Sequence, residues 1–351
     1  MNVGSHNVIL KHIKEKIVSK PVFLMMVGIA GSGKSTVAVK LRHQVLQEEN
    51  CKEKKIDIIS SDSLREELLG NINDQSQNDK IFGEMKKRTI NTLKEGHSVI
   101  YDATNLNVKD RRGILNAIEE QKIDCYKIAY IIPTTLTQCA TNTINRNRIV
   151  PLDVLQRMLH KFQIPIYQEG FHFIFVEGYN HSDFLDGFSE GKISISCRPL
   201  ILLDKMKNFN QETHYHKFSL LEHSILAYEE ILRHTRKYGE KDLVLEQAAL
   251  LHDLGKIKTK TKNDKGEYSY YGHANVGAYD FLRNLDYMGL NCFEQAIYCV
   301  ALINYHMEPF GWEEAKTSTV EKKKKFFGEK MYNDLMLLHK ADLYACTGNR
   351  E

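Results

Sequence analysis

Residues 22–35 read Val-Phe-Leu-Met-Met-Val-Gly-Ile-Ala-Gly-Ser-Gly-Lys-Ser. The first six residues have the length of a buried strand, and Gly28 to Ser35 fit the spacing G-x-x-x-x-G-K-[ST]. A helical pattern begins at Lys34. Between a strand and a helix, glycines let backbone N–H groups converge on phosphate oxygens, and the helix N-terminus adds free donors. The stretch therefore predicts a phosphate-binding loop for ATP or GTP.

The residue types in this loop have separate predicted tasks. Lys34 places a positive charge on the β- and γ-phosphates, and the Ser35 hydroxyl is a ligand for Mg²⁺. The alternative is a chance glycine-rich turn, which the flanking strand and helix argue against. We expect nucleotide contacts from Gly28, Gly31, Ser32, Gly33, Lys34, Ser35 and Thr36.

Around the loop, short apolar runs alternate with longer amphipathic stretches as far as residue 176. The predicted strands are Val22–Val27, Ile56–Ser60, Ser98–Tyr101, Tyr126–Ile132 and Phe171–Val176. The predicted helices are Lys34–Glu49, Leu64–Leu69, Asp79–Lys94, Val108–Gln121, Leu136–Asn145 and Leu152–Phe162. This alternation predicts an α/β domain with a parallel sheet and flanking helices.

The remainder of the chain has a helical periodicity. Predicted helices are Leu220–Arg236, Leu243–Leu251, Ala274–Leu285, Phe293–Tyr305 and Tyr332–Tyr344. The glycines and proline near residues 180–203 interrupt the pattern. We predict an α/β domain over residues 1–185, a linker over 186–203 and an all-α domain over 204–351.

Length and composition are consistent with two domains. The chain has 351 residues, 42% of them hydrophobic, and a net charge of +3, which permits a nucleic-acid substrate without requiring one. No apolar run is long enough for a bilayer, and no apolar leader segment precedes a cleavage site. Seven cysteines without Cys-x-x-Cys argue against a disulfide framework and a thiolate zinc site. We expect a soluble cytoplasmic protein.

Charged residues follow the predicted second and third strands, at the edge where open α/β sheets bind ligands. Asp62 and Arg65 lie three residues apart, so the carboxylate is placed to accept a proton while the guanidinium holds an anion. The alternative is a helix cap beside an exposed arginine. Asp102 is either a metal-associated carboxylate or a helix cap. Arg146 and Arg148 form either a lid over the phosphates or a solvated helix end.

Together these motifs, with Thr104-Asn105 and Val150-Pro151, resemble those of the phage-type polynucleotide 5′-hydroxyl kinase family over about residues 20–180. Zeta-toxin-like and small-molecule kinases share much of the pattern. The resemblance implies a P-loop kinase fold that uses ATP, or another nucleoside triphosphate, with Mg²⁺. It also implies that Asp62 is the general base, that Arg65 clamps the 3′ phosphate of the acceptor, and that Arg146 or Arg148 contacts the transferring phosphate.

In the second half, an apolar helix ends at two adjacent potential metal ligands, His252 and Asp253, and Lys256 follows one turn later. Further candidate ligands are His223, His273, His306 and Asp342. A His and Asp set without cysteine suits Mg²⁺, Mn²⁺, Fe²⁺ or Co²⁺ better than structural zinc. The alternative for any one histidine is a buried residue whose hydrogen bonds are satisfied.

The order His…His-Asp…Asp resembles the HD phosphohydrolase superfamily over about residues 204–342. Residues 206–223 are especially similar to the HD domains of bacterial CCA-adding enzymes. The resemblance implies one or two divalent metals of the Mn, Mg, Fe, Co or Ni class. It assigns a first metal to His223, His252, Asp253 and Asp342, a second to His273 and His306, and a substrate phosphate to Lys256. His214 and His216 are either substrate contacts or polar residues at a helix start.

A kinase and a phosphohydrolase in one chain fit the two ends of one RNA break. Our leading hypothesis is a bifunctional RNA end-healing enzyme. It combines a 5′-hydroxyl polynucleotide kinase with a metal-dependent 2′,3′-cyclic phosphate phosphodiesterase and phosphatase. The alternatives are a nucleoside or metabolite kinase fused to an HD nucleotidase, and a nucleotide-gated binding module. The first hypothesis implies RNA or DNA ends as substrates, a separate ligase as partner and no membrane, and leaves the oligomeric state open.

Overall fold

The computed structural model describes residues 3–144, 150–179, 198–212, 218–237, 242–285, 290, 292–312 and 314–348. The chain forms two compact units. The first comprises Met1–Met158 and Pro165–Ser182, and the second comprises Leu159–Ile164 and Asp183–Glu351. Each unit is described by itself.

The first unit is built on a five-stranded parallel sheet with the order β2-β3-β1-β4-β5. Its strands are β1 (Val22–Val27), β2 (Ile56–Ser60), β3 (Ser98–Asp102), β4 (Tyr126–Ile131) and β5 (Phe173–Val176). All five predicted strands are present, with ends that agree within two residues. Every residue of β1, β3 and β5 is buried, because helices cover both faces of the sheet.

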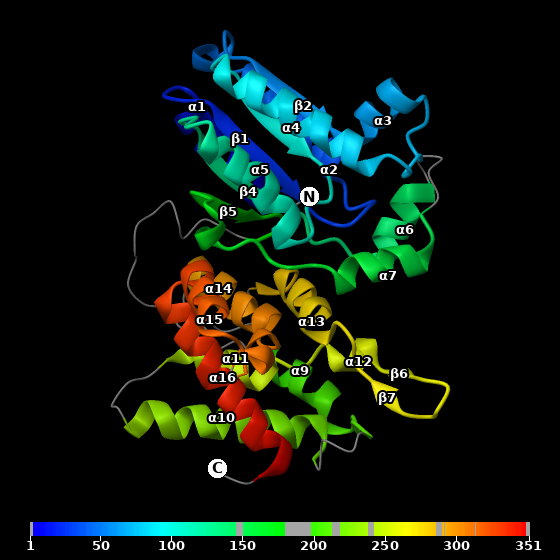
Figure 1. Cartoon of the computed structure of the whole chain (residues 1–351), viewed down its shortest axis with the longest axis vertical. Coiled ribbons are helices and arrows are strands. Elements are labelled where there is room, and N and C mark those ends of the chain that lie inside the picture. The colour runs from blue at the N-terminus through cyan, green and yellow to red at the C-terminus, as the bar shows by residue number, and fades with distance from the viewer. Residues whose placement is uncertain are drawn as a thin grey trace. The chain divides into compact units, whose positions relative to one another are not determined.

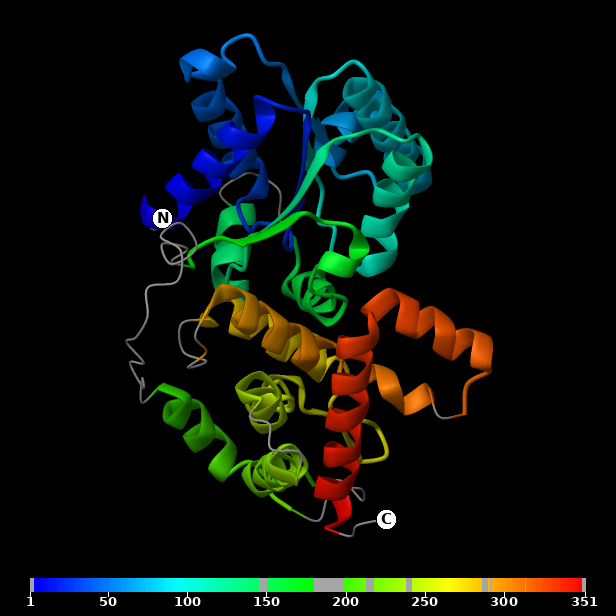
Figure 2. The same ribbon diagram turned by 90° about the vertical axis from the view of Figure 1, so that its left-hand side faces the viewer.

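Two pairs of helices cover the two faces of this sheet, as Figure 2 shows with α1 and α2 in blue and α4 and α5 in cyan. On one face, α1 and α2 pack on alternate residues of β1, namely Val22, Leu24 and Met26. The helices are α1 (Val3–Ile17), α2 (Lys34–Leu46), α3 (Ser61–Leu69), α4 (Asn78–Lys94), α5 (Val108–Glu120), α6 (Leu136–Ile144) and α7 (Leu152–His160), with short 3-10 helices η1 (Glu49–Cys51) and η2 (Tyr167–Glu169). Helix α1 precedes the predicted elements and is an addition to them.

The second unit is helical, as predicted, with one added hairpin (Figure 1). Helix α10 packs against α11 and α16, and α14 packs against α11 and α13. Its elements are α9 (Arg198–Lys207), α10 (Leu220–Lys237), α11 (Leu243–Leu251), α12 (Lys256–Thr259), β6 (Thr261–Lys262), β7 (Tyr268–Ser269), α13 (His273–Leu282), α14 (Phe293–Tyr305), η4 (Glu308–Gly311), α15 (Thr317–Phe327) and α16 (Glu329–Thr347).

The segment 159–164 belongs to the second unit although residues on both sides of it belong to the first. The Ile164 amide donates to Oδ1 of Asn304 at 2.6 Å, and the Tyr305 hydroxyl donates to the Ile164 carbonyl at 2.9 Å. The Phe162 ring meets the Tyr279 ring edge-on. These contacts fix the segment on α13 and α14. The domain limits drawn from the sequence, including the linker over 186–203, stay a prediction.

No helix in the described part of the chain combines the length and the apolar character that a membrane span requires.

Candidate functional site: a phosphate-binding loop and a buried histidine–aspartate cluster

The loop between β1 and α2 is held against neighbouring backbone on both sides. The Gly28 amide donates to the Thr104 carbonyl at 3.1 Å, and a Cβ on Gly28 would lie 2.7 Å from the Ser32 hydroxyl oxygen. Gly31 has a φ of 76° and touches the Cys139 carbonyl so closely that a side chain would clash. Thr134 and Asn142 donate hydrogen bonds to the carbonyls of Ser32 and Gly31. Only glycine fits at these points.

The side chain of Lys34 is buried and turns back into the loop. Its Nζ donates to the Ile29 carbonyl at 2.8 Å and to the Ser32 hydroxyl at 3.3 Å. The ammonium group therefore lies inside the ring of backbone formed by the loop. Ser35 is half-buried in the first turn of α2, where Thr36 is exposed. This arrangement suits phosphate at the helix N-terminus.

Asp102, at the end of β3, connects the loop with β2. It accepts hydrogen bonds from Ser35 and Ser60, and Lys34 and Asp62 lie close enough to influence its charge. Burial raises the pKa of Asp102 above its ordinary value, against the effect of these hydrogen bonds and of Lys34. The helix-cap alternative is wrong, because the side chain that caps α5 is Asn107.

Asn105 is a structural brace that the residue-by-residue interpretation did not identify. It has a φ of 49°, and its amide nitrogen donates to the Met26 carbonyl at 2.7 Å. Together with the bond from Gly28 to Thr104, this contact fixes the end of β3 to the start of the phosphate loop. The Thr104-Asn105 pair marks this segment in the sequence, but it does not indicate that Asn105 bonds to the Met26 carbonyl.

Asp62 and Arg65 form an ion pair at the start of α3. The Arg65 NH1 group donates to Asp62 Oδ1 at 3.0 Å, and NH2 donates to Asn78 at 2.8 Å and to Gln75 at 3.4 Å. Only 5% of the Arg65 side chain is exposed, against 33% of that of Asp62. The alternative of a capping aspartate beside an exposed arginine is wrong, since the N-cap residue is Ser60 and Arg65 is buried. The pair is held in one orientation by α4.

Two groups of predicted residues lie outside the part of the chain that the structure describes. They are Arg146 and Arg148 of the predicted lid, and His214 and His216.

In the second unit, four buried side chains converge from three elements. His223 comes from α10, His252 and Asp253 from the end of α11, and Asp342 from α16. The His223 Nε2 atom lies 3.2 Å from His252 Nε2, 3.2 Å from Asp253 Oδ2 and 3.1 Å from Asp342 Oδ1. One ligand atom from each residue falls within 4.8 Å of the others. This first group can surround one metal ion.

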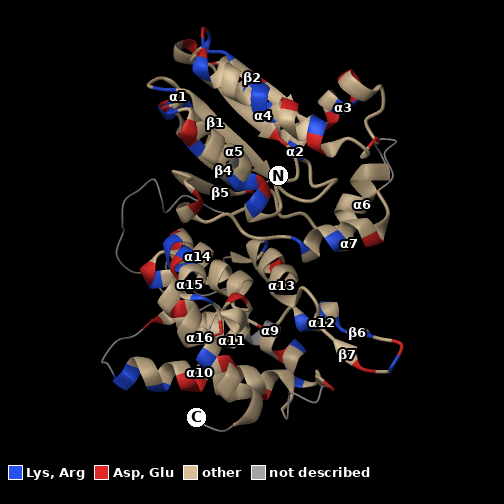
Figure 3. Cartoon of the chain, in the orientation of Figure 1, with Lys and Arg blue, Asp and Glu red and all other residues tan. Residues whose placement is uncertain are grey.

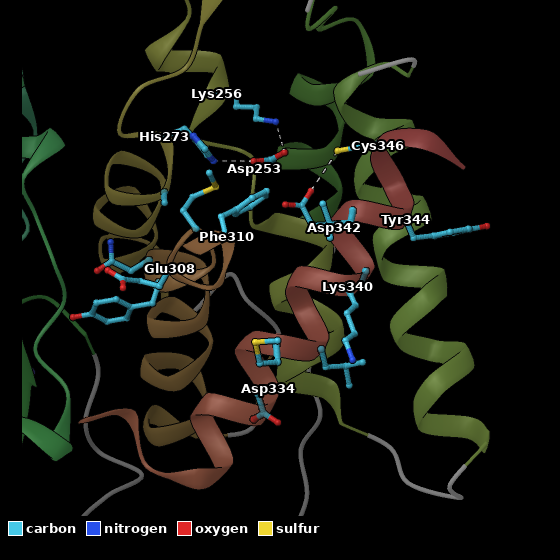
Figure 4. A pocket seen from close by; sticks show the side chains of 18 of the residues that line it. Asp253, Lys256, His273, Glu308, Phe310, Asp334, Lys340, Asp342, Tyr344 and Cys346 are labelled. Carbon is cyan, nitrogen blue, oxygen red and sulfur yellow. Dashed lines mark hydrogen bonds and ion pairs between the residues drawn. The ribbon is translucent and has the colours of Figure 1, made fainter. Parts of the chain in front are cut away.

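A second group shares Asp253 with the first. Its other oxygen, Oδ1, lies 3.1 Å from His273 Nε2 and 3.7 Å from His306 Nε2, and the two histidine nitrogens are 3.1 Å apart. Figure 4 shows Asp253 beside His273 and Lys256, with Asp342 opposite. The carboxylate of Asp253 therefore bridges two groups of metal-ligand type. The six candidates chosen from the sequence are all brought together.

Hydrogen bonds to carbonyl oxygens orient three of these rings. Nδ1 of His252, His273 and His306 lies 2.7–2.9 Å from the carbonyl oxygen of the residue three positions earlier. A carbonyl oxygen only accepts, so each Nδ1 donates its proton there and the Nε2 atom of each ring faces the cluster. Lone pairs facing each other at about 3.1 Å are repulsive unless a cation or proton lies between them. The residues present therefore fit divalent metals.

Electrostatics inside the cluster favour ionised carboxylates. Burial alone would raise the pKa of Asp253, but Lys256 and His252 hold it well below its usual range. Burial also opposes the protonation of His252, yet the two carboxylates outweigh it and raise the pKa of His252 to about 9. Burial, with His252 and His273 nearby, lowers the pKa of His306 to about 3. Metal uptake by such a site displaces protons.

Lys256 and two residues that the sequence did not single out as ligand partners complete the site. Lys256 Nζ lies 2.6 Å from Asp253 Oδ2 and donates to Gln211 at 2.9 Å. The thiol of Cys346 donates to Asp342 Oδ1 at 3.9 Å. A cavity of about 2080 Å³ opens on Asp253, His273 and Asp342, which leaves room for a substrate beside the cluster.

The fold and the two sites define a kinase-like P-loop domain followed by an HD domain. The AAA domain family matches residues 23–165, and the HD domain family matches residues 220–345. Both predicted domain types are thereby confirmed.

Known proteins resemble parts of the chain. The A-adding tRNA nucleotidyltransferase of Deinococcus radiodurans is 30% identical over 138 residues, which are 38% of this chain and 29% of that protein. The chain thus spans less than a third of that relative's length. A structure of the Pnkp1/Rnl/Hen1 RNA repair complex has 18% identity and a TM-score of 0.34, over 40% of this chain and 44% of that one. A gluconokinase from Sinorhizobium meliloti 1021 has 15% identity and a TM-score of 0.31, over 44% and 81%. Likeness at these TM-scores supports no functional argument.

Proposed function

We propose that the chain is a bifunctional RNA end-healing enzyme. Its first unit phosphorylates a 5′-hydroxyl end with a nucleoside triphosphate and Mg²⁺, and its second unit opens a 2′,3′-cyclic phosphate and removes the remaining phosphate. The observation that carries this proposal is the presence, in one chain, of a phosphate loop beside the Asp62–Arg65 pair and of a cluster with a bridging carboxylate.

In the kinase reaction, Lys34 would neutralise charge on the phosphates, and Ser35, which is hydrogen-bonded to Asp102, would be a ligand for Mg²⁺. The half-exposed carboxylate of Asp62 accepts the proton of the attacking 5′-hydroxyl. The guanidinium of Arg65, oriented by Asn78 and Gln75, binds the neighbouring phosphate of the acceptor strand. Arg146 or Arg148 contacts the transferring phosphate.

In the hydrolase reaction, His223, His252, Asp253 and Asp342 would hold one divalent ion, and Asp253, His273 and His306 would hold a second, of the Mn, Mg, Fe, Co or Ni class. Such ions supply Lewis-acid chemistry, since they polarise phosphoryl oxygens and acidify water. Lys256 stands beside Asp253 at the cavity wall, where its ammonium contacts a substrate phosphate. The hydrogen bonds from Nδ1 of His252, His273 and His306 to backbone carbonyls keep the Nε2 atoms of these rings in place.

The two activities act on opposite ends of one break, so they do not cancel each other. A relative named as a tRNA nucleotidyltransferase supports RNA, rather than DNA, as the substrate. After both ends are corrected, sealing requires a ligase, which we propose to be a separate protein.

One substrate tests both activities. An RNA oligonucleotide with a 5′-hydroxyl and a 2′,3′-cyclic phosphate is incubated with ATP, Mg²⁺ and Mn²⁺, Co²⁺ or Ni²⁺, and both ends are read by gel and mass spectrometry. We expect a 5′-phosphate and 2′,3′-hydroxyls. If the oligonucleotide is unchanged while free nucleosides are phosphorylated and nucleotides are hydrolysed, the small-molecule alternative replaces this proposal.

The Arg65→Lys variant tests the acceptor assignment. Lysine cannot contact Asp62 and Asn78 through two separate nitrogens in a fixed plane, so the phosphate clamp is lost. We expect KM for the oligonucleotide acceptor to rise about 10- to 100-fold, as for one charged hydrogen bond, and KM for ATP to stay constant. Arg88→Lys on α4 is the matched control. A rise in KM for ATP instead would contradict the assignment.

A further inference from the structure

A two-stranded hairpin projects from the second unit next to the metal cluster. Strands β6 and β7 pair antiparallel with Thr261 opposite Ser269 and Lys262 opposite Tyr268. Residues 261–267 are all exposed, so the hairpin contributes no side chain to a core at its tip. A hairpin of this size has little stability of its own. Packing in a core therefore does not explain which residues form the hairpin.

That composition is basic and aromatic. Five lysines occur within ten residues, at Lys256, Lys258, Lys260, Lys262 and Lys265, and tyrosines follow at 268, 270 and 271. With the two acids Asp264 and Glu267, residues 256–271 carry a net charge of +3. Figure 3 shows the lysines in blue along α12 and β6. We call residues 256–271 the lysine–tyrosine arm.

The lysines divide into those that hold the arm and those that do not. Lys258 pairs with Asp280, and Lys260 pairs with Glu212 at 2.8 Å while its Nζ lies 4.3 Å from the centre of the Tyr268 ring. Lys262 and Lys265 form no ion pair with any residue that the structure describes. Lys262 instead stands 5.1 Å from the Tyr268 ring centre. Lys262 still lies near enough to Glu212 to help lower the pKa of that carboxyl, so among the described residues the two lysines near the tip are only partly offset by carboxylates.

The outgoing strand of the arm runs into the cavity of the metal cluster. Residues 268–273 line that cavity without a break and end at the ligand His273. Tyr270 is buried and donates to the Gln211 carbonyl, while its neighbour Tyr271 is 78% exposed. Tyr271, whose ring meets that of His160 edge-on, therefore presents most of its aromatic surface to solvent two residues from the candidate ligand His273.

We propose that the lysine–tyrosine arm binds the single-stranded polynucleotide whose phosphate end enters the metal cluster, an inference that rests on the proposed function. Lys262 and Lys265 contact backbone phosphates, and a base near the end stacks on Tyr271. Lysines beside exposed aromatic rings bind single strands without sequence preference. The second unit therefore acts on the end of a chain in preference to a mononucleotide.

Binding tests the arm without any reaction. The full-length Lys262→Gln/Lys265→Gln variant is titrated with a fluorescently labelled RNA oligonucleotide of about 12 nucleotides ending in a 3′-hydroxyl, at several salt concentrations. We expect Kd to rise about tenfold at low salt and the slope of log K against log salt to fall by about 1.4, as for two lost phosphate contacts. The control Lys322→Gln/Lys325→Gln removes the same charge from exposed positions on α15 and should match wild type.

Tyr271 is tested with a pair of variants. Tyr271→Ala should weaken binding about tenfold through loss of base stacking, with little change in the salt slope, and Tyr271→Phe should restore it because the ring returns. If phenylalanine and alanine weaken binding equally, stacking on this residue is excluded.

Hydrolysis separates this inference from the proposed function. The ratio of kcat/KM for a 3′-phosphorylated oligonucleotide to that for bis(p-nitrophenyl) phosphate should fall about tenfold in the arm variant and not in the control. If wild type hydrolyses the oligonucleotide but arm and control variants agree in both ratio and Kd, the arm inference fails and end healing stands. If wild type hydrolyses only the small ester, end healing fails, and the Kd values still decide whether the arm binds RNA.

Discussion

Replacing Asp253 by alanine is expected to abolish phosphate removal at the 3′ end and leave 5′ phosphorylation intact. The two oxygens of this carboxylate serve both groups of the cluster, so one substitution opens both sites. It also leaves the buried Lys256 without the carboxylate that it contacts at 2.6 Å. We expect hydrolysis to fall at least about 10³-fold, as for loss of a central electrostatic group, and metal content measured by mass spectrometry to fall at both sites.

Two further variants make the Asp253 result specific. Glu229→Ala removes an exposed carboxylate of α10, the helix that also carries His223, and should keep full activity. His306→Ala removes a ligand from the second group alone and should retain metal in the first. If Asp253→Ala keeps its metal or its hydrolysis, the bridging role is wrong.

Replacing Lys34 by alanine should have the complementary effect. The buried ammonium lies inside the phosphate loop, where it donates to the Ile29 carbonyl and to the Ser32 hydroxyl. Without it, negative charge that develops on the phosphates is not neutralised. We expect 5′ phosphorylation to fall about 10²- to 10³-fold with hydrolysis unchanged, measured on the same oligonucleotide.

Lys86→Ala, at an exposed position on α4, is the control for Lys34→Ala and should behave as wild type. Loss of both activities in the Lys34 variant would show that its effect is structural. Retained phosphorylation would overturn the role of the loop.

Local sequence predicted the features that depend on neighbours along the chain. The strand–loop–helix around Lys34 has a fixed spacing, and the five buried strands show as apolar runs between amphipathic stretches. His252 and Asp253 stand out because they end an apolar helix. The grouping of the HD residues followed from resemblance to a family, since spacings of 29 and 89 residues carry no geometry of their own.

Contacts made across long separations were not predicted. Arg65 depends on Asn78 from another helix, and Lys256 depends on Gln211, 45 residues away. Neither partner belongs to a residue type or spacing that marks a site. The hairpin of β6 and β7 was missed for a different reason: its strands have two residues each, and all of them except the half-buried Tyr268 are exposed, so no apolar alternation exists to detect.

Two histidines of the metal cluster limit the substitutions that this site can accept. His252 and His306 are the C-cap residues of α11 and α14, and each donates its Nδ1 proton to a carbonyl of the last turn. Carbonyls there have no partner within the helix, so the same imidazole closes the helix end and aims its other nitrogen. Any side chain that replaces one of these histidines must both donate to the helix-end carbonyl and direct a ligand atom at the cluster. Glutamine or aspartate supplies a ligand atom but no ring with two nitrogens fixed on opposite sides. We expect these two positions to tolerate fewer substitutions than the carboxylate of Asp342, whose backbone lies within a continuous helix.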